Sequence, residues 1–230
     1  MEKEKKRAIA ALVFRLVALT VGVAGICYHM LINTVVDSGF MVRHNWAYFT
    51  LQTNLFSCII FAVLIWRGVK ELRRGRVSHI HPSVHLACTA YITMTLLGFW
   101  GLLAPLTGMP DNAYIFWDNL FVHTMTPLFA VADYVLFAQH GSLRKREAVR
   151  WLLYPAVYLV SVMVLAQVFT EPYYSFTMQG REIHLMYPYP FLDPQVLGVG
   201  GVVGVIAVLC AVFCLVGVLL IWVDGKLAKR

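Results

Sequence analysis

The sequence is poor in charge. Asp, Glu, Lys and Arg make up only 13% of its 230 residues, about half their share in an ordinary soluble domain, and 60% of the residues are hydrophobic. Mean hydropathy is +0.70. Apolar runs of roughly 20 residues, long enough to cross a bilayer, recur along the chain. A soluble globular protein is therefore excluded, and residues 1–230 are expected to form one helical membrane domain.

Alternation of polar and apolar residues is also missing, because the apolar runs are continuous, and this excludes a membrane β-barrel. The chain has no CxxC motif. All five cysteines fall inside apolar runs, as expected of small core residues: Cys27, Cys58, Cys88, Cys210 and Cys214. We therefore expect no disulfide framework, no metal site and no cofactor.

A clear small-residue cleavage site is lacking near the N-terminus. The charged residues 1–7 lead into an apolar run that is too long for the core of a signal peptide, so we interpret it as a retained first span. The whole pattern predicts an all-α bundle of six membrane-spanning helices. Their approximate ranges are 8–31, 46–66, 84–103, 115–137, 151–169 and 196–223.

The basic residues are segregated. Sixteen of the nineteen Lys and Arg residues fall in the N-terminus, the second-to-third loop, the fourth-to-fifth loop and the C-terminus, which six spans place on one side. The opposite loops contain only Arg43 and Arg181, and Arg15 inside span one is expected to extend back to the basic side. This segregation predicts that both termini are cytoplasmic. The net charge of +7 then reflects topology, and no nucleic-acid partner is expected.

Polar residues interrupt the start of span two. Thr50, Thr53, Asn54 and Ser57 follow i, i+3, i+4 and i+7 spacing and form one stripe on a helix. Polar groups are costly in hydrocarbon unless they find partners. The stripe is therefore expected to face other protein or a cavity, as one half of a site.

Span four carries a second polar stripe. Its members at helical spacing are Asn119, His123, Thr126, Ala130 and Asp133. A histidine inside a span indicates a functional site by default. Both spans run inward from the outer face, and at about 1.5 Å per residue Thr50 and His123 lie roughly 6 and 12 Å deep. The two stripes are thus expected to face each other in one leaflet.

A threonine beside a histidine can act as a nucleophile, because neutral imidazole is the usual base near pH 7. Thr50 and His123 could attack an acyl carbonyl and form an acyl-threonine that water clears. Asp118 lies about 140° around the helix from His123, and Asp133 lies about two to three turns deeper, so neither is expected to orient the imidazole. The alternative is a buried hydrogen-bond network that only locks two helices together.

The remaining polar residues are assigned supporting roles. Gln52, Asn54 or Asn119 could orient the imidazole or donate to the oxyanion. Thr53 and Thr126 complete the expected substrate pocket.

The longest outer loop, residues 170–195, is rich in Tyr and Pro. This composition suits an ordered cap at the headgroup level, and an aromatic belt without contact to the site is the alternative. Beyond the loop, Gly200 and Gly204 form a GxxxG pair, which predicts a helix-packing face. A dinucleotide-binding loop is excluded there, because no strand precedes the glycines.

Three motifs give a resemblance to a known family. Tyr48-Phe49-Thr50 opens span two, Trp117-x-Asn119-x-x-x-His123 lies in span four, and Tyr189-Pro190-Phe191-Leu192 precedes span six. With this order and six spans over nearly the whole chain, the sequence resembles the androgen-induced-gene family of six-pass membrane proteins, and most closely its prokaryotic relatives. The animal members are threonine hydrolases of fatty acid esters of hydroxy fatty acids. The resemblance implies Thr50 as nucleophile, His123 as base and a lipid ester as substrate.

Two other functions compete with an intramembrane lipid ester hydrolase. One is a small-molecule or ion carrier, although no internal repeat is visible. The intramembrane groups that such a carrier would use are His123, Asp133, Asn54 and Gln167. The other is a haem-binding electron carrier, in which His29 and His123 could share a haem, whereas His85 lies near the opposite end of the bundle.

Overall fold

The computed structural model describes residues 2–36, 45–107, 112–168, 172–178 and 181–229. Within these residues six helical segments are long and apolar enough to cross a membrane, which confirms the predicted number of spans. They are α1 (Glu2–Val36), α3 (Phe49–Leu72), α4 (Pro82–Gly98) with its continuation, α6 (Ala113–Leu120) with α7 (Thr126–Phe137), α8 (Arg146–Arg150) with α9 (Leu153–Val168), and α10 (Pro194–Leu227). Arg43, which was assigned to the first outer loop, lies outside the described residues.

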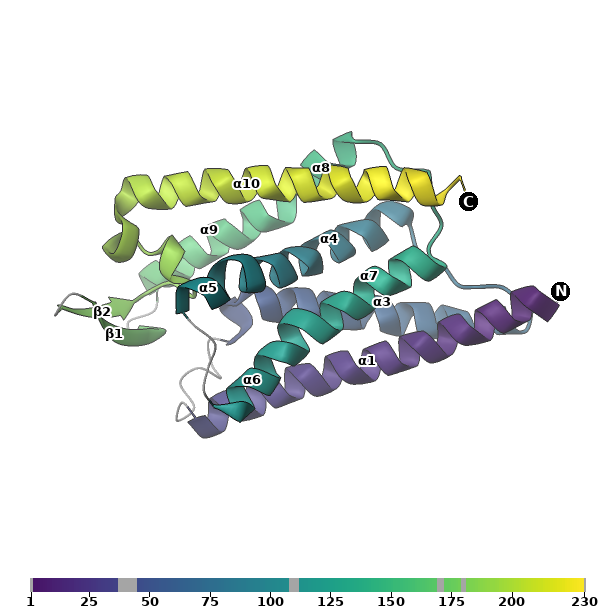
Figure 1. The fold of residues 1–230 in the computed structure, drawn as a ribbon, viewed down its shortest axis with the longest axis horizontal. Coiled ribbons are helices and arrows are strands. Elements are labelled where there is room, and N and C mark those ends of the chain that lie inside the picture. Colours follow the sequence, from purple (N-terminus) through teal and green to yellow (C-terminus); the bar gives the residue numbers. More distant parts are fainter. Residues whose placement is uncertain (1, 37–44, 108–111, 169–171, 179–180, 230) are drawn as a thin grey trace.

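Both chain ends lie at one end of the bundle, and the small strands β1 and β2 lie at the other (Figure 1). Two of the basic loops reach the same end as the chain termini. A Cβ added to Gly75 would lie 3.7 Å from Lys5, and one added to Gly141 would lie 2.6 Å from Ala228. The basic segments of the sequence therefore gather at one end of the bundle, which we call the basic end.

The start of α10 follows from its local sequence. Asp193 caps the helix by accepting a hydrogen bond from the Gln195 amide at 2.8 Å, and Pro194 takes the first helical position. The helix is broken near this start at Gly198, whose φ of 69° and ψ of 163° suit glycine alone. The break separates the capped first turn from the apolar span that follows.

The long loop before α10 forms an ordered cap, which we define as residues 172–178 and 181–193. Its antiparallel strands β1 (Tyr174–Met178) and β2 (Arg181–Leu185) pair Tyr174 with Leu185. The all-α prediction missed this hairpin, although a glycine between two short segments is a hairpin signal. After the hairpin, a 3₁₀ turn (Pro190–Leu192) leads into α10, and the Asp193 carboxylate also accepts from the Met186 amide at 3.1 Å.

Two buried carboxylates join helices at the basic end. Asp133 of α7 accepts from Arg15 Nε of α1 at 2.7 Å and lies 3.2 Å from His85 Nε2 of α4. Asp224 of α10 accepts from the Tyr134 hydroxyl of α7 at 2.7 Å. Arg15 extends toward the basic side as expected, because Nη1 donates to Ser78 in the second-to-third loop, but the side chain is only 1% exposed. A buried guanidinium is tolerated here because a carboxylate and Ser78 inside the bundle satisfy its donors.

The glycines of α10 do not form the predicted packing face within the described part of the chain. A Cβ on Gly200 or Gly204 would have no atom within 4 Å, and the neighbouring Val199 and Val203 are exposed. The spans that contain α9 and α10 are also the least buried of the six, at 22% of their most apolar windows against 50% for α4. These two helices therefore form the side of the bundle that is least buried against the rest of the protein.

Candidate active site

Two π-helical segments lie where the site forms. One, η3 (Phe121–Met125), separates α6 from α7. The other, η2 (Phe99–Leu103), continues α4 into the short helix α5 (Ala104–Thr107). Segments of this kind insert a residue into an α-helix and are frequent at functional sites. The hydropathy pattern of the sequence predicted continuous spans and gave no sign of either insertion.

Pro127 and Asn54 explain how η3 is held. The Thr126 amide bonds to the Phe121 carbonyl, five residues back, and Pro127 has no N–H to give to the Val122 carbonyl. That carbonyl would be unsatisfied inside the bundle, at a cost comparable to a lost hydrogen bond. Asn54 of α3 supplies the missing donor, because its Nδ2 lies 2.9 Å from the Val122 oxygen.

The Asn54 bridge docks α3 against η3 and sets the two central residues side by side. Asn54 Nδ2 also donates to the Thr50 carbonyl at 2.8 Å. Thr50 Oγ1 lies 3.2 Å from His123 Nε2, within hydrogen-bond distance. The His123 ring stacks on Phe99 of η2, with centroids 4.1 Å apart and planes inclined by 16°. The structure thus brings together the predicted pair and adds Phe99, which orients the imidazole and which sequence reasoning missed.

The protonation of His123 follows from this geometry. Nε2 accepts the Thr50 proton only if the ring proton sits on Nδ1. Nδ1 is buried, and no acceptor among the described residues reaches it with full hydrogen-bond geometry. Asn119 lies four residues earlier, and no hydrogen bond of its side-chain amide to His123 occurs in the described structure.

Two predicted supporting residues hold helices together instead of lining the cavity. Gln52 donates to the Trp46 carbonyl at 2.7 Å and accepts from the Tyr154 hydroxyl of α9 at 2.7 Å. Thr53 pairs with Thr95 Oγ1 of α4 at 2.8 Å. These contacts fix the first two turns of α3, the segment that carries Thr50, against its neighbours.

The polar stripe of span four divides at η3. Thr126 Oγ1 bonds to the Phe121 carbonyl at 3.3 Å, and the residue lies against Gly22 of α1. Asp133 also bonds to α1, whereas His123 bonds to α3. His123 and Asp133 therefore bond to two neighbouring helices, α3 and α1. The extra residue in η3 turns the helix by about 100°, so that its two halves face different neighbours.

A cavity of about 350 Å³ opens beside Thr50 and His123. Its lining is almost wholly apolar, and none of the described residues that line it is charged. The helices α9 and α10 form the wall opposite the pair, and the cap contributes Tyr189, Phe191 and Leu192. Of the two alternatives for the outer loop, a cap in contact with the site is therefore the one observed.

The other histidines are engaged elsewhere. His29 Nδ1 of α1 lies 2.8 Å from Asp118 Oδ2 of α6. Asp118, the carboxylate nearest to His123 in sequence, is thus paired with His29 and not with His123. His85 is paired with Asp133. Each histidine considered for haem thus has a ring nitrogen bound to another side chain, and we propose no haem site. No group of three potential metal ligands occurs among the described residues.

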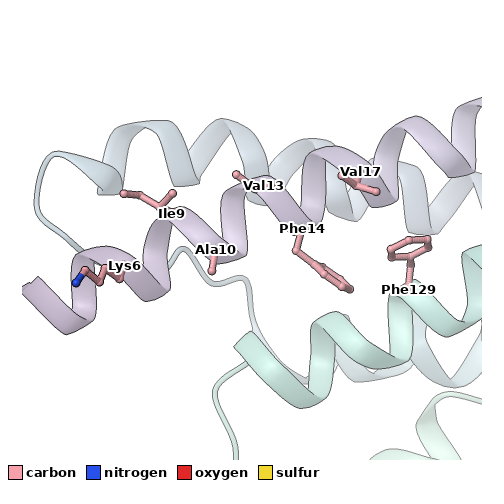
Figure 2. A pocket seen from close by; sticks show the side chains of 7 residues that line it. All are labelled: Lys6, Ile9, Ala10, Val13, Phe14, Val17 and Phe129. Carbon is pink, nitrogen blue, oxygen red and sulfur yellow. The ribbon is translucent and has the colours of Figure 1, made fainter.

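A second hollow lies on the outside of α1 beside α7 (Figure 2). It measures about 580 Å³ and is more open than the cavity at Thr50. Phe14 and Phe129 face each other along it, with ring centroids 5.4 Å apart, and Lys6 lies at its basic end. Apart from this lysine the lining is apolar, so the hollow offers no group for acyl chemistry, and we place the candidate site at Thr50.

Comparison with known proteins found no matching family model, no matching curated protein and no matching solved structure. Fold and site together define a class: a candidate multi-pass helical membrane protein in which a threonine and a histidine meet beside an apolar cavity.

Proposed function

We propose that the protein is an intramembrane hydrolase of lipid esters, such as fatty acid esters of hydroxy fatty acids. Thr50 is the nucleophile and His123 is the base. The observation that carries the proposal is the 3.2 Å contact between Thr50 Oγ1 and His123 Nε2 in the wall of an apolar cavity. The resemblance to the androgen-induced-gene family, through the motifs at Thr50, His123 and residues 189–192, supports the same reaction.

The bond changes can be written with these two side chains and water. His123 Nε2 takes the proton of Thr50 Oγ1 as the oxygen bonds to the ester carbon, and the carbonyl electron pair moves onto its oxygen. Collapse of this intermediate breaks the bond to the alcohol oxygen, which leaves with the proton from His123. Water then attacks the acyl-threonine with His123 as base, which releases the fatty acid and restores the Thr50 hydroxyl.

The cavity favours an uncharged apolar chain as the group next to the ester. Its lining along α4 and η2 runs from Met94 to Leu103, about 13 Å at 1.5 Å per residue. Each methylene buried there contributes about 0.8 kcal/mol to binding. A charged headgroup finds no counter-ion among the described lining residues, so it must remain outside.

The location of the site in the membrane follows from the charge segregation. With the basic end cytoplasmic, Thr50 and the cap lie in the outer leaflet and at the outer face. A lipid ester then enters sideways from that leaflet between the least buried helices, α9 and α10, and the products leave by the same route.

The groups that suggested a carrier are engaged in other contacts or lie on the surface. Asp133 is paired with Arg15 and His85, and Asn54 donates both of its observed hydrogen bonds to backbone carbonyls. Gln167 lies on the exposed face of α9. No continuous polar path links these groups to His123 in the described contacts, so we propose the hydrolase alone.

The test is the loss of activity in Thr50→Ala and His123→Ala proteins. We expect each to lose about 10³-fold or more in the hydrolysis of 4-nitrophenyl octanoate. A fluorophosphonate probe should label Thr50 in the parent protein and fail to label either variant. Thr93→Ala is the matched control, because its hydroxyl bonds to the Thr89 carbonyl of its own helix. Full activity in a folded Thr50→Ala protein would contradict the proposal.

A further inference from the structure

The start of α3 presents two amides next to the nucleophile. The carbonyl of Tyr48, the residue before the helix, accepts from the amides of Leu51 and Gln52, and no side chain caps this end. The amides of Phe49 and Thr50 therefore have no acceptor inside the helix. Both residues line the cavity, so these donors lie beside the place where an ester would react.

Tyr189 of the cap packs against the segment that begins α3. Its ring packs edge-on against Tyr48, with centroids 5.6 Å apart, and stacks on Phe191 with centroids 5.1 Å apart and planes inclined by 7°. Tyr189 lines the cavity together with Phe49 and Thr50, and it packs in the same apolar cluster as Phe49. The phenol therefore lies in the cavity wall beside the nucleophile and the start of α3.

We propose that the Tyr189 hydroxyl is a third catalytic group, which donates a hydrogen bond to the oxygen of the ester carbonyl as Thr50 attacks it. This inference rests on the proposed ester hydrolysis. The Thr50 amide completes the oxyanion site, since the amide of a nucleophilic residue also serves its own oxyanion in serine proteases. Thr50 then contributes both the attacking oxygen and one of the donors that stabilise the negative charge it creates.

Two physical features suit Tyr189 to donation. Burial raises the pKa of the phenol, so the hydroxyl keeps its proton at neutral pH. The two ring contacts hold the phenol in place before the substrate arrives, and a donor fixed in advance costs no reorganisation during the reaction.

The rival role for the same side chain is that of a plug. A phenol oxygen that fills the oxyanion position would have to leave before a substrate carbonyl could enter, and removing it would speed the reaction. Donation and plugging therefore predict opposite effects of Tyr189→Phe. This variant keeps the ring and both ring contacts and removes only the hydroxyl, so the cap should remain folded.

The matched control is Tyr187→Phe, because Tyr187 packs in the same cluster of the cap and is not among the described cavity-lining residues. For Tyr189→Phe we expect kcat on 4-nitrophenyl octanoate to fall about 10²–10³-fold. KM should stay unchanged, because the lost hydrogen bond strengthens only in the transition state. Labelling of Thr50 by a fluorophosphonate should slow in parallel, because the phosphoryl oxygen of the probe takes the same position.

A kcat of Tyr189→Phe equal to or above that of Tyr187→Phe overturns the inference, as does a raised KM with an unchanged kcat. Thr50→Ala in the same assay separates the two proposals. If Thr50→Ala is inactive and Tyr189→Phe is fully active, the role of Tyr189 fails and the hydrolase stands. If Thr50→Ala is active, both fail.

Discussion

Asn54 shows how one side chain can position a reactive pair through backbone carbonyls. The residue is fully buried, and its amide satisfies the Val122 carbonyl that Pro127 leaves without a donor. Sequence reasoning gave Asn54 a role at the imidazole or the oxyanion. It missed the real partner, because a free backbone carbonyl appears only once the π-helical register of η3 is known.

Replacing Asn54 by Leu should therefore loosen η3. The Val122 carbonyl then lies buried without a donor, which costs about 1–3 kcal/mol of stability. The shift of His123 that follows should lower kcat by up to about 10²-fold, because catalysis is sensitive to small misplacements. Thermal unfolding in detergent and ester hydrolysis measure the two effects.

Ser57→Ala is the control for this experiment, one turn further along the same stripe. The Ser57 hydroxyl bonds only to the Thr53 carbonyl of its own helix, so its removal should change stability little. Equal unfolding temperatures for the Asn54 and Ser57 variants would show that the bridge does not hold η3.

At the scale of the element, two glycines near the junction of α4 and η2 face different surroundings. A Cβ on Gly98, at the end of α4, or on Gly101, inside η2, would meet no atom within 4 Å. Gly98 lines the cavity, whereas Gly101 is exposed on the outside of the segment. The helical φ of −64° at Gly98 is compatible with any side chain, so the backbone conformation does not require glycine. The glycine instead leaves space open because it has no side chain.

A Gly98→Leu side chain should enter the cavity and shorten the acyl chain that fits. If three methylenes are excluded at about 0.8 kcal/mol each, kcat/KM for a long-chain 4-nitrophenyl ester falls roughly 50-fold. The acetate ester should be hydrolysed as before, because it does not reach the filled space. A series of chain lengths measures the change.

Gly101→Leu makes the same substitution on the exposed side of η2 and should leave the chain-length profile unaltered. Similar profiles for the two variants would mean that the acyl chain does not lie in this cavity. A loss of activity on every ester in the Gly98 variant would point instead to damage at His123.

For the whole molecule, charge and hydropathy sufficed to predict six spans and the gathering of basic segments at one end. They could not predict the two π-helical insertions, the hairpin of the cap or the burial of Arg15. Each of these depends on contacts between residues far apart in the chain, such as Arg15 with Asp133. The Thr50–His123 pair could be predicted by comparing how deep each residue lies in its span, because both helices start from the same face. Phe99 and Tyr189 belong to no polar stripe, so nothing in the sequence pattern singled them out.

The predicted topology can be checked with two exposed positions at opposite ends of the bundle, Ala113 at the start of α6 and Ser142 near the basic end. In intact cells, a membrane-impermeant maleimide should label Ala113→Cys and leave Ser142→Cys unlabelled until the membrane is opened. The parent protein, with its five native cysteines, supplies the background. The reverse pattern would place the termini outside and the candidate site in the inner leaflet.

Buried hydrogen bonds join α1, α3 and α7, whereas α9 and α10 are the least buried helices. This difference should affect how the sequence changes during evolution. Changes in α1, α3 or α7 must preserve buried pairs such as Arg15–Asp133 and Asn54–Val122, so their substitutions are coupled. The cavity wall on α9 and α10 has apolar side chains such as Leu159, and one of these can be exchanged without a compensating change elsewhere. If the proposed hydrolysis holds, we expect natural variation among relatives to concentrate on that wall and to change which lipid chain is accepted.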